Sequence, residues 1–285
     1  PTSGLTALLG SPVAHSISPL MHNESFRLLG LDYVYLCFDV NEETLPAAVA
    51  GLKTCGIRGF NLTMPNKNKI VELLDELSPE AQLIGAVNTV LNDNGKLIGY
   101  NTDGYGFMQS VRDAGHDITG KNITVMGVGG ASMAICAQSA LDGAASVHIF
   151  ARRTSRYWNR TQKFAENLSA KTGCQVCLFD NDDHTALRDS IAQSYLLINA
   201  TSVGMVPDID DTIIKDTSLF HPELVVADVV YEPQETRLLR EAKATGCQTF
   251  NGMYMLLHQG AKAFQIWTGQ EMPVSVIKEK YFSVK

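Results

Sequence analysis

The stretch from Ile123 to Ser132 constrains the fold of this chain more than any other. Strand-forming residues run directly into a turn that contains Gly127 and Gly129, and apolar helix-forming residues follow from Met133. Glycines let a backbone turn sharply and approach a ligand closely, and the free N–H groups at the start of a helix favour a pyrophosphate. The order of strand, glycine turn and helix therefore predicts a dinucleotide-binding unit.

Two further observations bear on this prediction. The third glycine of the G-x-G-x-x-G pattern is Ser132 here, so an ordinary helix-capping turn is the alternative interpretation. Apolar residues 147–150 indicate a second strand about twenty residues after the turn, which is the spacing of a βαβ nucleotide-binding unit. This spacing favours the dinucleotide site.

Bulk composition excludes several classes of function. The chain has 285 residues, of which 45% are hydrophobic and 19% charged, and this length is enough for two hydrophobic cores. Its net charge of −7 argues against nucleic acid and against an anionic membrane surface as partners. No apolar run approaches the roughly 20 residues that span a bilayer, and no signal peptide is apparent at the N-terminus. We therefore expect a cytoplasmic protein.

The six cysteines are scattered and mostly lie in apolar segments, which is typical of reduced core thiols. Cys174 and Cys177 have the spacing of a metal-binding or redox pair. On the strand expected there, positions i and i+3 face opposite sides, so the sequence predicts no metal site.

Alternating strands and helices fill the first hundred residues and predict an open α/β unit. Ser18 is the expected N-cap of the first helix, with Pro19 at its first position. Expected strands cover residues 5–9, 33–38, 59–63 and 86–91, and expected helices cover residues 20–29, 42–53 and 69–74.

The same alternation continues after the glycine turn. The fold predicted is α/β, with an N-terminal open α/β substrate domain and a Rossmann-like doubly wound dinucleotide-binding domain. Because the last helices are expected to pack back on the first unit, the substrate domain is discontinuous. It comprises residues 1–103 and 238–285, and the dinucleotide-binding domain comprises residues 104–237.

Seven short stretches in register resemble the shikimate dehydrogenase family, and the C-terminal third is similar to its quinate/shikimate dehydrogenase branch. The stretches are residues 15–19, 61–67, 85–89, 99–104, 127–131, 199–205 and 256–261. The resemblance implies a two-domain enzyme of aromatic amino acid biosynthesis with its site in the cleft between domains. The implied reaction is the reversible reduction of 3-dehydroshikimate to shikimate with a nicotinamide dinucleotide.

Lys67 and Asp103 are the candidate catalytic residues. Reduction of a ketone needs a proton donor near the forming alkoxide and a group that holds this donor in place. Both residues follow strand-like segments, so they can meet at the rim of one crevice. The family resemblance implies an acid/base pair; without it, Lys67 would be a solvated surface lysine. Which of the two delivers the proton is left open.

A polyol acid also needs ligands for its carboxylate and hydroxyls, because leaving them unpaired on burial costs about 1–3 kcal/mol each. Ser16 and Ser18 can offer hydroxyl donors to the carboxylate, although Ser18 alone would be interpreted as a helix cap. The resemblance implies further substrate contacts from Asn61, Thr63, Asn88, Tyr231 and Gln259. A plain turn role is the alternative for Asn88.

The residues after the second strand of the dinucleotide unit indicate the cofactor. Arg152, Arg153 and Arg156 lie there with Thr154 and no carboxylate, which favours the 2′-phosphate of NADP over the ribose of NAD. NAD use is left open. The family implies further cofactor contacts from Gly127, Gly129, Gly130, Ala131, Thr201, Gly204, Met205, Val229, Gly252 and Met255.

Two other functions compete with an NADP-dependent shikimate dehydrogenase. The nearer one is a quinate/shikimate dehydrogenase that also uses NAD. The more distant one is a non-catalytic dinucleotide-sensing protein on the same fold, which would need neither Lys67 nor Asp103. A homodimer is left open.

Overall fold

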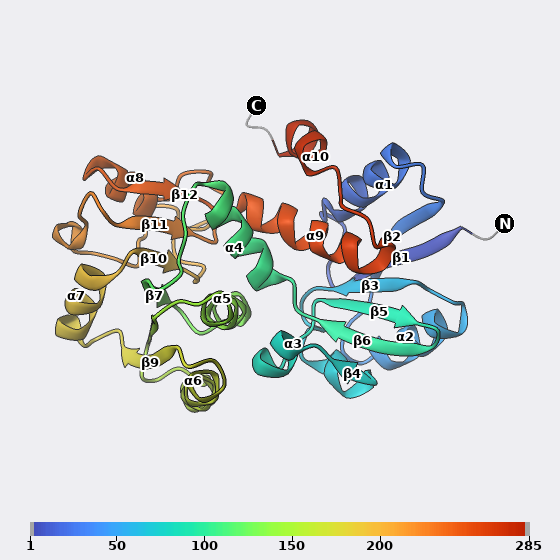
Figure 1. Ribbon diagram of the computed structural model, residues 1–285, viewed down its shortest axis with the longest axis horizontal. Coiled ribbons are helices and arrows are strands. Elements are labelled where there is room, and N and C mark those ends of the chain that lie inside the picture. The colour runs from blue at the N-terminus through green and yellow to red at the C-terminus, as the bar shows by residue number, and fades with distance from the viewer. Residues whose placement is uncertain (1–2, 283–285) are drawn as a thin grey trace. The chain divides into compact units, whose positions relative to one another are not determined.

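The computed structural model describes residues 3–282, which form two compact units (Figure 1). The first unit ends at Gly106 and resumes at Leu257, and the second unit is Phe107–Leu256. Within the described residues, each unit contains one six-stranded sheet. The predicted α/β fold is therefore confirmed.

The sheet of the first unit has the strand order β2-β1-β3-β5-β6-β4. β1 pairs in parallel with β2 and β3, whereas β5 pairs antiparallel with both β3 and β6. Its strands are β1 (Gly4–Gly10), β2 (Tyr33–Asp39), β3 (Gly59–Leu62), β4 (Glu76–Leu77), β5 (Thr89–Asp93) and β6 (Lys96–Tyr100).

The helices of the first unit include two that continue into the second unit, α4 and α9. They are α1 (Ser18–Leu28), α2 (Leu45–Thr54), the 3₁₀ helix η1 (Lys69–Leu73), α3 (Pro79–Ile84), α4 (Asp103–Asp113), α9 (Met253–Thr268) and α10 (Val274–Tyr281).

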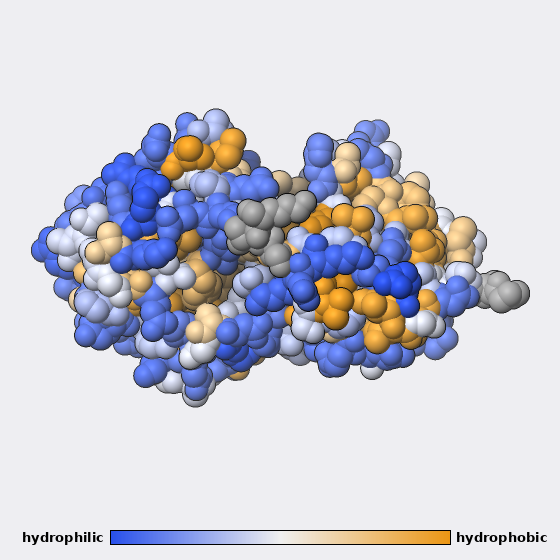
Figure 2. Space-filling view, turned by 90° about the horizontal axis from the view of Figure 1, so that it is seen from above, coloured by the Kyte–Doolittle hydropathy of each residue, from blue (hydrophilic) through white to orange (hydrophobic). Residues whose placement is uncertain are grey.

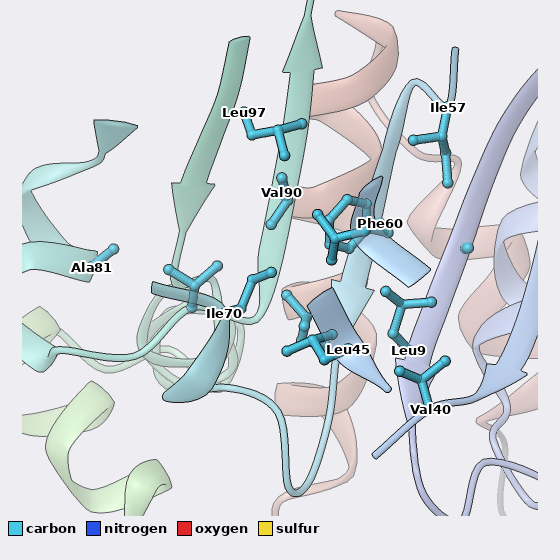
Figure 3. Close-up of a cluster of buried hydrophobic side chains, with 13 residues drawn as sticks. Leu9, Val40, Leu45, Ile57, Phe60, Ile70, Ala81, Val90 and Leu97 are labelled. Atoms are coloured by element: carbon cyan, nitrogen blue, oxygen red, sulfur yellow. The ribbon is translucent and has the colours of Figure 1, made fainter. Parts of the chain in front are cut away.

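A hydrophobic cluster lies under one face of this sheet (Figure 3). Leu9 and Phe60 from neighbouring parallel strands are fully buried against Leu45 of α2 and Ile70 of η1. Complete burial of such a side chain stabilises a fold by about 1.5–3 kcal/mol. This packing anchors the carboxyl end of β3, from which the loop to Lys67 departs.

Two local predictions in this unit were wrong. Ser18 does not cap α1: the N-cap position is Ile17, without a side-chain cap, and Ser18 is the first residue of the helix. Residues 69–73 form a 3₁₀ helix, because five residues confined between the β3 loop and β4 leave no room for longer α-helical pairing.

The sheet of the second unit is entirely parallel, in the order β9-β8-β7-β10-β11-β12. Strand order reverses between β7 and β10, as in a doubly wound dinucleotide-binding fold. The strands are β7 (Asn122–Met126), β8 (Ser146–Ala151), β9 (Gln175–Asp180), β10 (Leu196–Asn199), β11 (Val225–Asp228) and β12 (Gln248–Phe250). The helices are α5 (Gly130–Leu141), α6 (Trp158–Thr172), α7 (His184–Gln193), the 3₁₀ helix η2 (Thr217–Leu219) and α8 (Arg237–Ala244).

The chain returns to the first unit later than residue 238. Leu238 and Leu239 of α8 are buried in the core of the second unit, and β12 extends the second sheet by pairing with β11. The second compact unit consequently runs to Leu256, within α9. The short strand β12 carries only three residues, too few for the sequence pattern to reveal.

Hydrophobic residues are visible at several places on the face of the molecule that Figure 2 shows. The exposed hydrophobic side chains of the first unit include Leu20 and Leu28 of α1, Leu36 of β2 and Val276 of α10. None of the helices within residues 3–282 has the length and apolar character that a membrane crossing demands.

Candidate functional site

Lys67 and Asp103 form an ion pair in the first unit, with Lys67 Nζ 2.6 Å from Asp103 Oδ2. The two side chains are 31% and 13% exposed, so the pair is partly shielded and still reachable from solvent. Asp103 is the first residue of α4, where the positive end of the helix dipole favours a carboxylate. A lysine ammonium held in this way is a positioned proton donor.

The loop of Lys67 is held from two sides. The buried Asn66 donates from Nδ2 to the Val40 carbonyl at 2.7 Å, and Val87 N donates to the Lys67 carbonyl at 2.8 Å. Because these bonds fix the backbone on both sides of the side chain, the ammonium projects from a rigid support.

Asn88 connects the Lys67–Asp103 ion pair to the rest of the candidate site. Its Nδ2 donates to Asp103 Oδ1 at 2.8 Å, and its Oδ1 accepts from Thr102 N at 2.8 Å. Both Asp103 oxygens are thus occupied, one by Lys67 and one by Asn88. Gln259 Oε1 on α9 lies 3.5 Å from the same Asn88 nitrogen. The buried Asn88 is therefore more than a turn residue.

Asn61 lies deeper than a substrate ligand was expected to lie. It is 6% exposed, and its Nδ2 donates to the Asn88 carbonyl at 3.1 Å and to Thr89 Oγ1 at 2.9 Å. Its Oδ1 accepts from the Tyr35 hydroxyl at 2.8 Å. Both amide hydrogens are used inside the protein, so Asn61 supports Asn88 in this structure.

The loop between β1 and α1 carries Ser16 and Ser18. Ser16 Oγ accepts a hydrogen bond from Ser18 N at 3.2 Å, and Ser18 is buried while Ser16 is half-buried. Thr63, at the end of β3, is also half-buried and donates its N–H to the Leu9 carbonyl. These three hydroxyl residues follow the carboxyl ends of the adjacent parallel strands β1 and β3.

The glycine turn of the second unit follows β7, where the sequence places it. Gly127 has φ +111°, and a Cβ there would lie 2.8 Å from Thr201 Cγ2 and 3.0 Å from the Ala200 carbonyl oxygen. Only glycine fits this position. Gly129 is the N-cap of α5 and has no neighbour within 4 Å of an added Cβ. The first turn of α5, with no side-chain cap among the described residues, can receive an anion.

Ser132 explains how the turn forms without the third glycine. The Ser132 side chain is fully buried, and its Oγ donates to the Gly127 carbonyl at 2.6 Å. The hydroxyl thereby holds the turn against α5, a role that a small polar residue fulfils and a larger one would not.

The loop after β10 is held by a buried carboxylate. Asn199 Oδ1 accepts from Thr201 Oγ1 at 2.6 Å, and Asn199 Nδ2 donates to Asp228 Oδ1 at 3.0 Å. Asp228 also accepts from Val230 N and from Thr236 Oγ1, the N-cap of α8. Burial raises the pKa of Asp228 from 3.8 to about 6. This network fixes the loops that carry Thr201 and Val229.

The arginine loop follows β8. Arg152, Arg153, Thr154 and Arg156 are all exposed, and no carboxylate of the described residues forms an ion pair with these three arginines. The Arg153 guanidinium lies 4.6 Å from the ring of Trp158 and that of Arg156 lies 4.7 Å from the ring of Tyr157. Cationic groups without an acidic partner are suited to a phosphate.

Comparison with known proteins agrees with this geometry. The model of the shikimate dehydrogenase substrate binding domain matches residues 8–90, and that of the shikimate 5'-dehydrogenase C-terminal domain matches residues 252–280. A curated relative from Listeria innocua, named shikimate dehydrogenase (NADP(+)), is 51% identical over 98% of this chain and 95% of its own. The chain belongs to the shikimate dehydrogenase family.

Solved structures of this family share the fold. Shikimate 5-dehydrogenase from Listeria monocytogenes, in complex with shikimate and NAD, has a TM-score of 0.95 and 50% identity, covering 97% of this chain and 96% of that one. Quinate dehydrogenase from Corynebacterium glutamicum, in complex with NAD, has a TM-score of 0.87 and 31% identity, covering 99% of each chain. The family predicted from the seven motifs is confirmed.

The remaining predicted contacts lie in the second unit. Met205 and Tyr231 are exposed, and Met255 on α9 is half-buried. A Cβ on Gly252 would lie 2.1 Å from the Val229 carbonyl oxygen, so these two family positions pack directly on each other. Gly130 and Ala131 are the first residues of α5, and Gly204 lies in the loop after β10.

Sequence reasoning missed the supporting residues. Tyr35, Thr102 and Asp228 lie outside the predicted set, although each makes hydrogen bonds to predicted residues or to their immediate supports. Thr102 lies inside one of the family stretches, which was the available signal. Tyr35 and Asp228 lie in strands whose alternation indicates only burial.

Proposed function

We propose that this protein is a shikimate dehydrogenase that reversibly interconverts 3-dehydroshikimate and shikimate with NADP. The single observation that supports it most is the cluster of Lys67, Asp103 and Asn88, in a chain that belongs to this family. We further propose that the first unit binds the substrate and the second unit binds the dinucleotide.

The residues of the cluster suit the chemistry of a secondary alcohol. When bound, the nicotinamide supplies or accepts the hydride. Lys67 donates a proton to the oxygen of the ketone in reduction and accepts it back in oxidation, while Asp103 keeps the ammonium in place. Asn88 binds the far oxygen of Asp103, so the carboxylate cannot swing away when the charge on Lys67 changes.

The hydroxyl and amide groups around the pair suit a polyol acid. Ser16, Ser18 and Thr63 are proposed to bind the carboxylate end, and Gln259 and Asn88 the hydroxyls. Tyr231 is proposed as a contact from the second unit. Asn61, whose amide hydrogens are both used internally, is proposed to act mainly by supporting Asn88.

The second unit fits a dinucleotide. Gly129 and Gly130 leave open space at the uncapped start of α5 for a pyrophosphate, and the arginines after β8, which form no ion pair within the described residues, suit a 2′-phosphate. We therefore propose a preference for NADP, with NAD as a weaker cofactor because no acidic residue follows β8 to bind its ribose.

A matrix of four assays tests this function. Initial rates are measured with shikimate and with quinate, each with NADP⁺ and with NAD⁺. The proposal expects the highest kcat/KM for shikimate with NADP⁺. A higher value for quinate with NAD⁺ would favour the quinate dehydrogenase function, for which a relative of this fold is a precedent. Dinucleotide binding without turnover of either acid would favour the sensing protein.

Two broader predictions belong with this proposal. We propose a cytoplasmic location, which is consistent with six cysteines that are all free thiols within the described residues. We also propose that the protein forms a homodimer through the edge strand β2, where Leu36 is exposed. Light scattering of the wild type and of Leu36→Lys measures the molar mass in solution. A monomeric wild type contradicts the proposed dimer.

A further inference from the structure

The Tyr35 hydroxyl is a polar group inside an aromatic core, and the chemistry described above does not use it. Tyr35 lies on the edge strand β2 and is 1% exposed. A buried hydroxyl costs about 1–3 kcal/mol unless it is hydrogen-bonded. The hydrogen-bond partners of the Tyr35 hydroxyl therefore indicate its role.

The ring of Tyr35 is held rigidly. It stacks on the ring of His22 with centroids 4.4 Å apart and an interplanar angle of 9°. The centroid of the Trp267 ring lies 6.0 Å from that of Tyr35. The Asn23 side chain clamps the backbone, accepting from Tyr35 N at 2.8 Å and donating to Tyr35 O at 3.0 Å. The hydroxyl is consequently presented at one fixed point.

At that point the hydroxyl meets one residue of the candidate substrate site. It donates its one hydrogen to Asn61 Oδ1 at 2.8 Å. Burial raises the pKa of Tyr35 well above 10, so the phenol keeps its proton and remains a donor. Asn61 in turn binds the Asn88 carbonyl, which ties this network to the catalytic pair.

We propose that Tyr35 is a positioning residue for substrate binding, whose hydroxyl orients the Asn61 amide and, through it, Asn88 before the substrate arrives. This inference rests on the proposed function, because Asn88 is a substrate ligand only there. Without the Tyr35 hydroxyl, Asn61 would lose the bond that orients its amide, and the Asn88 carbonyl would lose a fixed donor. The substrate would then have to order Asn61 and Asn88 when it binds.

The test is Tyr35→Phe, which removes one oxygen and keeps the ring. We expect the KM for shikimate to rise roughly five- to tenfold, with kcat within about twofold of the wild type and the KM for NADP⁺ unchanged. Tyr33→Phe is the matched control: Tyr33 faces the same side of β2 and its ring stacks on that of Phe26 with centroids 5.2 Å apart, whereas among residues 3–282 Asn61 Oδ1 accepts its side-chain hydrogen bond from Tyr35. The control should leave all three constants unchanged.

Two results would overturn the proposal. One is an unchanged KM for shikimate in a folded Tyr35→Phe protein. The other is an equal change in both KM values, which indicates general loosening of the fold. A double-mutant cycle with Asn61→Ala sharpens the test, because a hydroxyl that acts through Asn61 has little further effect once Asn61 is truncated. Full additivity contradicts the proposed role.

Calorimetric binding of shikimate separates this inference from the proposed function. A wild type that binds shikimate but does not turn it over contradicts the dehydrogenase function, and the comparison of Tyr35→Phe with wild type is then made on the dissociation constant. A wild type that turns shikimate over while Tyr35→Phe binds it equally well contradicts the role of Tyr35 alone. A wild type that does not bind shikimate overturns both.

Discussion

Lys67 Nζ lies 2.6 Å from Asp103 Oδ2, although 36 positions separate the two residues in the chain. Lys67 leaves a loop after β3, and Asp103 begins α4 after β6. The β-sheet brings these two points together because β5 pairs with both β3 and β6. The proposed acid/base chemistry depends on this proximity.

Truncation of Lys67 tests the chemistry directly. Lys67→Ala should lower kcat by at least about a hundredfold, because a positioned proton donor contributes 10²–10⁴-fold. The dissociation constant of NADP⁺, measured by calorimetry, should change little, since Lys67 lies in the first unit. Lys69→Ala is the matched control, because Lys69 lies two residues after Lys67 and forms a surface ion pair with Glu72. A Lys67→Ala enzyme with a near-normal rate would end the acid/base assignment.

Removal of an arginine after β8 tests cofactor preference. Arg152→Ala or Arg153→Ala should weaken NADP⁺ binding roughly 10- to 100-fold, because a hydrogen bond to a charged group contributes about 1.5–3 kcal/mol. Binding of NAD⁺, which lacks the 2′-phosphate, should change far less. Lys171→Ala, at the far end of α6, removes the same charge as a control. Equal losses for both dinucleotides would remove the 2′-phosphate argument.

Two substitutions in the glycine turn should separate an effect on protein stability from an effect on NADP⁺ binding. Gly127→Ala should lower the melting temperature, because its φ is +111° and the added Cβ would lie 2.8 Å from Thr201. Strained backbone of this kind costs about 1–3 kcal/mol. Gly129→Ala has a φ of −80° and open space, so it should weaken NADP⁺ binding at an unchanged melting temperature. Equal melting temperatures for the two variants would contradict the structure of the turn.

His22 should make the protein sensitive to acid. Burial without a hydrogen-bond partner lowers the pKa of His22 from 6.5 to about 3. Below pH 6.5 the unfolded chain binds a proton that the folded protein excludes, so stability is present above pH 6.5 and lost as pH falls toward 3. The loss is about 1.4 kcal/mol per pH unit.

The matching variant is His22→Phe, which keeps an aromatic ring against Tyr35. Its melting temperature should fall less than that of the wild type between pH 7 and pH 4.5. His184→Gln, at an exposed position on α7, serves as the control and should keep the wild-type profile. Parallel profiles for wild type and His22→Phe would show that another group governs the acid response.

Local sequence determined much of this protein. The glycine turn predicted a strand, a sharp bend and a helix around Gly127, and β7 and α5 lie there. Such features follow from the sequence alone because they depend on residues within one or two turns of each other: φ preference at glycine, and period-2 alternation in strands. The arginine loop after β8 follows for the same reason.

Tertiary structure decided what depends on residues far apart in the chain. The sequence predicted Ser18 as a helix cap and, with Asn61, as a substrate ligand, and it placed Tyr35 only in a strand. The fold puts the N-cap at Ile17 and joins Tyr35 to Asn61 through one buried hydrogen bond. It also completed the second sheet with β12 and kept α8 in that unit. Hydrogen-bond partners of buried polar groups are chosen by the packing of whole elements, and no local pattern encodes that choice.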